Sequence, residues 1–205
     1  MKEKILKEKI IMKRLIVFAV IMLLLGGSSA FGAEYSVDTA HSDIGFTVAH
    51  MVISKVRGAF DNFTGSFNVD EKGKLISAEA AIDVKSIDTR NGKRDADLRS
   101  ANFFDVANYP TLKFKSTSVK VNADGSYTVK GNLSIRNVTK EVDLMGNLVG
   151  PSKDPWGNTR IGFSARGLIN RKEFGLLWNK TLETGGLLVG DEVTLSLEGE
   201  GVLKK

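Results

Sequence analysis

Two histidines are the residues of this chain best suited to metal binding or acid–base chemistry, and both lie in the stretch DTAHSDIGFTVAHM. His41 and His50 are nine residues apart, an odd separation, so on one regular strand they would point to opposite faces. A catalytic zinc site needs three protein ligands, and because the chain has no cysteine the others would have to be carboxylates. The spacing makes the histidines poor co-ligands. His50 alternates in phase with Ile44, Phe46 and Val48, which predicts that it is a hydrogen-bonded residue of the core or pocket rim.

Other catalytic constellations have little support. The chain contains no Gly-x-Ser-x-Gly elbow, no cysteine nucleophile and no phosphate-binding glycine loop of a standard pattern. Asp95 and Asp97 form a carboxylate pair, but the arginines beside them favour ion-paired surface groups. We therefore predict no catalytic residue and no metal site. An enzyme or metal-dependent factor that uses His41 and His50 stays open as the competing hypothesis.

The net charge of +5 comes mostly from the N-terminal segment. Six Lys or Arg and two Asp or Glu lie in residues 1–33, which leaves 23 basic and 22 acidic residues elsewhere. The remaining chain therefore has a net charge of only about +1, too little positive charge to indicate nucleic-acid binding.

The N-terminal segment itself is typical of a bacterial secretory signal peptide. Lys13 and Arg14 precede an apolar run over residues 15–25, and small residues follow it. A transmembrane anchor is the rival interpretation, but the run is shorter than the ~20 apolar residues needed to span a bilayer. We predict a signal peptide over residues 1–33, cleaved within 30–33, and a periplasmic protein without a stable membrane anchor. Without cysteine, the exported chain has no disulfide and no acylated cysteine.

Beyond the signal the dominant hydrophobic period is two, which indicates β-strands. Apolar residues alternate along about eight segments, and turn sequences such as Asp124-Gly125 separate them. Three clear examples are Ile44/Phe46/Val48/His50, Phe63/Gly65/Phe67/Val69 and Ile76/Ala78/Ala80/Ile82/Val84. The exception is the polar segment 92–105, GKRDADLRSANFFD, for which we predict a short helix and a loop.

Eight antiparallel strands have to close or stack, because open edges would promote aggregation. Closure gives an all-β, eight-stranded barrel that can hold one small ligand, as in lipocalins, whereas a β-sandwich would have no cavity. The inward positions combine phenylalanines with many Gly and Ala residues, which favours a cavity, although glycines also mark bulges. The eleven phenylalanines, against two tryptophans and three tyrosines, either pack the core or line such a cavity.

The motifs of the chain resemble those of the YceI-like family of bacterial periplasmic proteins. They occur in the family's order from about Tyr35 to Val202: YSVDTAHSDIGFTVAHM, GAFDNFTGSF, SIDT, KRDADLRSANFFDVANYPTLKFKST, VKGNLSIRNVTKEV and RKEFG. The resemblance implies a lipocalin-like barrel whose long apolar cavity takes a polyisoprenoid or similar amphiphile, and it implies no established enzymatic activity.

Individual residues match two motifs of the family. Asp38, His41, Phe46, His50, Gly58, Phe60 and Gly65 match the first motif, and Arg94, Asp95, Leu98, Phe103, Phe104, Tyr109, Pro110 and Phe114 match the second. Asp97 stands where the family often has a histidine, so a role for that histidine does not carry over.

Together these observations predict a domain over residues 34–205 that carries or sequesters an isoprenoid-type or quinone-type lipid, without a cofactor. Polar groups at the mouth would select the head group, with His50, Arg94, Asp95 and Arg99 as candidates. The full set of predicted ligand-binding residues is Phe46, Val48, His50, Phe60, Phe63, Phe67, Arg94, Asp95, Arg99, Phe103, Phe114 and Phe163. A homodimer, and a stress-related module that meets another periplasmic protein, stay open.

Overall fold

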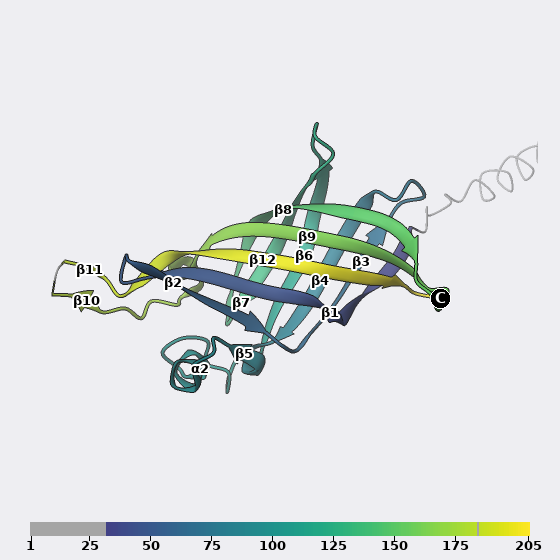
Figure 1. Ribbon diagram of the computed structural model, residues 1–205. Coiled ribbons are helices and arrows are strands. Elements are labelled where there is room, and N and C mark those ends of the chain that lie inside the picture. The colour runs from purple at the N-terminus through teal and green to yellow at the C-terminus, as the bar shows by residue number, and fades with distance from the viewer. Residues whose placement is uncertain (1–31, 184) are drawn as a thin grey trace, which may run out of the picture. The chain divides into compact units, whose positions relative to one another are not determined.

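The structure is a computed structural model of the chain and describes residues 32–183 and 185–205. These residues form a closed antiparallel barrel in which β12 returns to pair with β1 (Figure 1). Around the barrel the strands are β1 (Ala33–His50), β3 (Phe63–Val69), β4 (Leu75–Asp83), β6 (Thr111–Val121), β7 (Tyr127–Ile135), β8 (Val138–Lys153), β9 (Thr159–Asn170) and β12 (Val189–Leu203). The predicted eight-stranded barrel is confirmed, and the β-sandwich alternative is wrong because the sheet closes on itself.

The predicted signal peptide, residues 1–33, lies outside the described residues except for Gly32 and Ala33, and it stays a prediction. Ala33 is already the first residue of β1 and pairs with Val69 of β3. Within the described part of the chain, no helix combines the length and the apolar character needed to cross a membrane.

Shorter elements extend or cover the barrel. β2 (Ser54–Phe60) continues the hairpin that β1 begins, and β5 (Ile87–Asp88) pairs with the end of β2. β10 (Thr181–Leu182) and β11 (Gly186–Leu187) form a separate small hairpin. The remaining elements are the helix α2 (Gly92–Arg99) and the 3-10 helices η1 (Val84–Ser86) and η2 (Arg171–Phe174).

Helix α2 lies within the segment 92–105 and has a capped first turn. The side chain of Asn91 accepts a hydrogen bond from the backbone N–H of Arg94 at 3.1 Å, which caps the first turn. Asp95 in that turn and Arg99 in the last turn both complement the helix dipole. The predicted short helix and loop over 92–105 are therefore confirmed.

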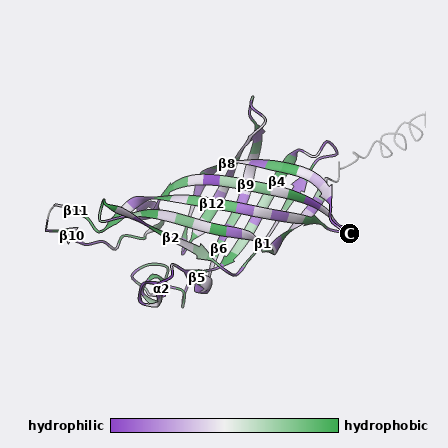
Figure 2. Ribbon diagram, viewed as in Figure 1, coloured by the Kyte–Doolittle hydropathy of each residue, from purple (hydrophilic) through white to green (hydrophobic). Residues whose placement is uncertain are grey.

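Side chains alternate between the interior and the solvent along the long strands, which produces the banded colouring of Figure 2. Phe67, for example, points inward beside its cross-strand partner Ala78. Ile76 was predicted on this inner face but is 46% exposed. A register shift after Asn68 pairs Val69 with Leu75, so Leu75 packs inside and Ile76 turns outward.

Two strand pairs of the barrel wall are hydrogen-bonded over only part of their length. β1 pairs with β3 as far as Ser36 and with β2 from Gly45 onward, so residues 37–44 have no ladder partner on that side. The β4–β6 ladder ends at the pair Glu79 and Lys115, although β6 continues to Val121. In Figure 1 the two strands separate beyond this point.

Glycines on the inner face provide space for aromatic rings. A Cβ on Gly131 would overlap the ring of Phe114, and a Cβ on Gly201 would overlap the ring of Phe67. The small inward residues favoured an empty cavity, but neighbouring side chains fill part of the space beside them.

Replacing Gly131 by alanine is expected to destabilise the barrel by about 1–3 kcal/mol, because the new Cβ meets the Phe114 ring and also lies 2.8 Å from the carbonyl oxygen of Lys115. Gly92→Ala is the matched control, because a Cβ there meets no atom within 4 Å. Chemical denaturation of both variants measures the difference. Equal stability of the two variants would contradict the account of the glycines.

Candidate ligand cavity

A cavity of about 120 Å³ lies inside the barrel and is bounded by residues from all eight barrel strands. Its wall is largely apolar, and two of its rings, Phe67 and Phe163, meet edge to face with centroids 5.8 Å apart. The apolar lining residues are Val37, Ile44, Phe63, Phe67, Leu75, Phe114, Tyr127, Val129, Leu144, Leu148, Phe163 and Leu197, with small residues such as Ala78, Ala80 and Ala165 between them.

The cavity is small, and the rings of Phe114 and Phe67 in its wall lie over Gly131 and Gly201. Its volume is close to that of an engineered apolar cavity of about 150 Å³ that takes up benzene, and below the range of roughly 300–1,000 Å³ typical of drug-sized ligands. The resemblance implied a longer cavity. A long extended chain needs more space than this volume offers, and Phe114 and Phe163 in the cavity wall are both half-buried.

A second hollow of about 430 Å³ adjoins the cavity on the outer side of β3, β4 and β6. The two share six residues in their walls: Thr64, Gly65, Ser66, Glu79, Ala80 and Phe114. Lys113 and Lys115 of β6 line this outer groove, and Lys204 lies at its other side. Cationic side chains are therefore available close to the apolar cavity.

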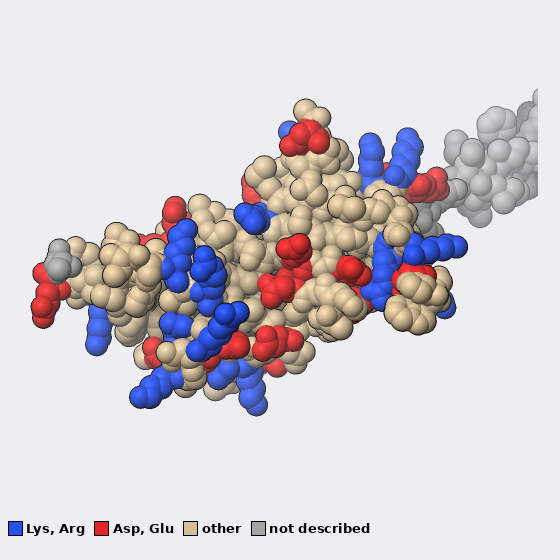
Figure 3. Space-filling view, viewed as in Figure 1, with Lys and Arg blue, Asp and Glu red and all other residues tan. Residues whose placement is uncertain are grey.

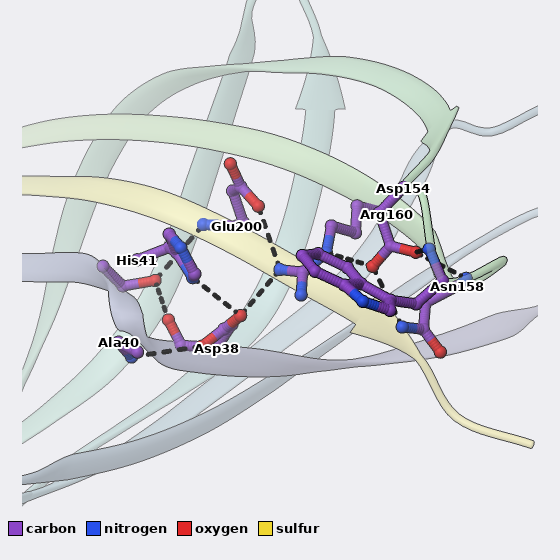
Figure 4. A network of polar contacts seen from close by, with 9 residues as sticks. Asp38, Ala40, His41, Asp154, Asn158, Arg160 and Glu200 are labelled. Carbon is purple, nitrogen blue, oxygen red and sulfur yellow. Dashed lines mark hydrogen bonds and ion pairs between the residues drawn. The ribbon is translucent and has the colours of Figure 1, made fainter.

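The conspicuous polar cluster of the barrel lies elsewhere, where β1 bulges (Figure 4). The guanidinium group of Arg160 donates hydrogen bonds to Asp38 Oδ2 at 2.6 Å, Glu200 Oε2 at 3.0 Å and Asp154 Oδ2 at 2.9 Å. These contacts tie β1, β9 and β12 to the turn after β8. The β1–β12 register shifts between Asp38 and Asp43, so the cluster holds the irregular part of the closing ladder.

Hydrogen bonding in this cluster lowers the pKa of two carboxyl groups. The hydrogen bond from Arg160 is the main cause that holds the pKa of Asp38 below its usual value. The pKa of Asp154 falls to about 2, chiefly through the hydrogen bond from the Asn158 side chain and also through that from Arg160. Both carboxylates also raise the pKa of the Arg160 guanidinium.

The two histidines take no part in a common site. His41 is 61% exposed, and its Nδ1 lies 3.0 Å from Asp38 Oδ2 at the edge of the cluster. His50 pairs with Val189 at the end of β1, nine residues beyond His41 and on the far side of the bulge. Residues 32–183 and 185–205 contain no group of three or more His, Cys, Asp or Glu placed to hold a metal ion.

The domain profile of the YceI-like family matches residues 35–201, and the barrel occupies this same range. The chain belongs to the YceI-like family. Protein YceI of Salmonella newport is 39% identical over 196 residues, and the match covers 94% of this chain and 99% of that protein.

Two solved structures place the YceI-like barrel in context. The Campylobacter jejuni YCEI protein superimposes with a TM-score of 0.66 at 28% identity, over 82% of this chain and 97% of that one. A polyisoprenoid binding domain from Saccharophagus degradans, implicated in plant cell wall breakdown, superimposes with a TM-score of 0.61 over 84% of this chain and 99% of that domain. At 18% identity the second similarity shows the fold alone.

Four of the twelve predicted ligand-binding residues line the cavity of this YceI-like barrel: Phe63, Phe67, Phe114 and Phe163. Phe46 and Phe60 instead pack against each other, with ring centroids 5.8 Å apart, in the largest buried cluster. Val48 lies further along β1 and pairs with Val193, and His50 follows it at the end of the strand. Binding of a ligand by these residues stays a prediction.

Arg94, Asp95 and Arg99 fix helix α2 to the segment before it and are absent from the cavity lining. Asp95, only 5% exposed, accepts hydrogen bonds from Thr89 N at 2.9 Å and Thr89 Oγ1 at 2.5 Å. Arg94 donates to the same Thr89 through its Nε and Nη2, and Arg99 donates to the carbonyl oxygens of residues 85 and 87. All three side chains therefore stabilise the position of α2 against residues 85–89.

Phe103, the last of the twelve, packs on the indole of Trp178 with ring centroids 5.2 Å apart. Arg136 Nη1 donates to the Phe103 carbonyl oxygen at 3.2 Å. Phe103 thus joins the loop after α2 to the loop after η2.

The cavity also contains residues that the sequence interpretation did not select. They are mainly aliphatic or small, such as Leu144, Leu148 and Ala165. They share the inward period of the selected phenylalanines, so that period could have found them. What it could not show is how far along the barrel each residue lies.

Asp95→Ala is expected to destabilise the barrel by about 1–3 kcal/mol, because the amide and hydroxyl of Thr89 lose their buried acceptor. Urea denaturation measures the loss. Lys93→Ala, an exposed change in the same helix, is the control and should be nearly neutral. An undiminished midpoint for Asp95→Ala would refute the structural role.

Acid is expected to weaken the barrel through Asp154. Because the pKa of Asp154 is about 2 in the folded protein against an ordinary value of 3.8, its contribution to stability is complete above pH 3.8 and is lost as the pH falls towards 2. Asp154→Asn should therefore unfold at lower temperature at neutral pH and lose less stability on acidification. Thermal melts across this range test it, with the exposed Asp61→Asn as control. Parallel pH profiles for wild type and Asp154→Asn would disprove it.

Proposed function

We propose that this YceI-like protein is an exported binding protein that holds the apolar chain of an isoprenoid-type, quinone-type or similar amphiphile in its barrel. The observation that carries the proposal is the apolar cavity, whose lining comes from every strand of a closed barrel. Burial of apolar surface is favourable and non-directional, so such a wall binds hydrocarbon with little discrimination between chains.

The fold comparison supports the same class of ligand. The Saccharophagus degradans domain that shares this fold is described as polyisoprenoid binding. The size of the cavity adds a condition, because a long chain would need aromatic side chains to move aside. The ligand-bound barrel is therefore a rearranged state, in which rings such as Phe114 move away from the glycines that they cover.

The head group would lie outside the apolar wall. Lys113 and Lys115 line the outer groove that adjoins the cavity, so they suit an anionic head group. His50 and the Arg94/Asp95/Arg99 segment remain the alternative candidates from the sequence. None of these residues lines the cavity or the outer groove, so Lys113 and Lys115 are the candidates nearer to the cavity.

Export to the periplasm is part of the proposal and rests on the three-part pattern of residues 1–33. Binding without catalysis is supported by the positions of His41 and His50 at distant points of β1. Neither histidine lines the cavity, so neither would meet a ligand held there.

Filling the cavity tests the proposal. Ala80→Phe places a large side chain on the inner face, and we expect it to lower uptake of an isoprenoid lipid at least about tenfold, because the apolar surface available to the ligand is lost. Uptake is measured by extraction and mass spectrometry after incubation of residues 32–205 with the lipid. Phe114→Ala, which enlarges the cavity, should keep or increase uptake if the variant folds.

Two controls separate the binding site from general damage. Met145→Phe changes an outward residue of β8 and should take up lipid like the wild type. The double variant His41→Gln, His50→Gln should do so as well, whereas loss of uptake there would favour the histidine-dependent alternative. Unchanged uptake by folded Ala80→Phe would reject the cavity as the binding site.

A further inference from the structure

Two adjacent hairpins project together from one end of the barrel, at the left of Figure 1. One is the turn between β1 and β2, residues 51–53, and the other is the β10–β11 hairpin. The backbone N–H of Met51 donates to the carbonyl oxygen of Leu188 at 2.9 Å. Val52 Cγ2 lies 3.7 Å from the place that a Cβ on Gly186 would occupy. The two hairpins are therefore in contact and form one end of the barrel.

This end carries exposed apolar side chains. Ile53 is 84% exposed and Val52 is 80% exposed, and Met51 and Leu187 beside them are also exposed. We call these four residues the apolar tip. Other exposed large apolar side chains are distributed over β4, β6, β8, β9 and single turns. A cluster of this kind on a soluble surface marks an interaction site.

The backbone of the turn indicates that these side chains serve a purpose other than turn formation. Met51 and Val52 have φ angles of 54° and 65°, in the left-handed region. Gly, Asn and Asp are the usual residues at such positions of a hairpin, and a β-branched residue there is an outlier. The chain therefore keeps valine at the tip at a cost to the local fold.

Basic side chains lie behind the tip. Lys55 and Arg57 are exposed on β2, and Lys180 is exposed just before β10. One acidic residue, Glu183, lies between β10 and β11. In Figure 3 this end is mostly uncharged apart from acidic atoms at its far left, and Lys and Arg side chains gather nearer the barrel. An apolar end with cations behind it matches the interface of an anionic bilayer.

We propose that the apolar tip docks reversibly on the surface of an anionic lipid membrane. The tip is a projection rather than a groove, and a bilayer can accept a projecting apolar end without a matching shape. A protein partner would need a complementary hollow for the two turns. Docking does not depend on the proposed ligand, because it uses only the side chains of the apolar tip and the cations behind it.

The test is sedimentation of residues 32–205 with vesicles of phosphatidylcholine mixed with phosphatidylglycerol. The decisive variant is Val52→Asn with Ile53→Ser, because asparagine suits the left-handed position and the turn should form at least as well. We expect its vesicle affinity to fall at least about tenfold, since two inserted aliphatic side chains are lost. Its thermal stability should be unchanged or higher. The matched control, Met145→Asn with Val149→Ser on β8, should bind like the wild type.

The charges provide a second readout. Lys55→Gln with Lys180→Gln should weaken binding to the mixed vesicles and leave the weak binding to phosphatidylcholine alone unchanged. Added salt should act in the same direction, because screening shortens the reach of surface charges to less than about 10 Å above 0.1 M.

Several results would overturn the docking proposal. One is that the wild type does not bind the mixed vesicles. Another is that the variant Val52→Asn with Ile53→Ser binds them as tightly as the wild type. Self-association that this variant abolishes, without vesicle binding, would assign the tip to a second copy of the chain instead. Because the vesicles contain no isoprenoid, Ala80→Phe should dock normally. Failure of ligand uptake and failure of docking are therefore observed separately.

Discussion

The barrel depends on the ladder between β12 and β1, which joins the two ends of the domain from the pair Tyr35 and Leu203 to the pair His50 and Val189. Without this ladder the sheet would have two open edges and an exposed apolar face. With it, every inward side chain faces the same enclosed space. The cavity, the ring contacts and the absence of an open edge between β12 and β1 all follow from closure.

Closure also explains why the polar cluster lies at the bulge of β1. A strand of 18 residues has to bend as it passes around the barrel, and β1 does so between Asp38 and Asp43, where its register with β12 shifts. Arg160 reaches across from β9 and binds carboxylates on β1, on β12 and in the turn after β8. The arginine thus holds the irregular segment where regular backbone pairing is interrupted, and His41 belongs to this support.

Much of the fold could be predicted from local pattern alone. The period of two identified the strands and most of their inward faces, and the polar segment 92–105 located helix α2. The pattern failed at Ile76, because a one-residue shift reverses the faces of a strand and nothing in the local sequence marks that shift. It also could not separate Phe163, which lines the cavity, from Phe46, which packs in the core. That difference depends on position along the barrel, which is a long-range property.

The polar candidates illustrate the same limit. Arg94, Asp95 and Arg99 occur in a family motif and look suitable for a head group, yet the hydrogen bonds of their side chains all go to residues 85–89. Lys113 and Lys115 were not predicted as ligand-binding residues, because alternating lysines are ordinary on the outer face of a strand. Only the barrel places them beside the cavity.

Whether the cavity holds an amphiphile is measured most directly by native mass spectrometry of the protein purified from cells that express the full chain, followed by organic extraction. The account predicts a stoichiometric extra mass that is released as an isoprenoid-type or quinone-type lipid. A ligand-free mass that persists after incubation with such lipids would contradict it.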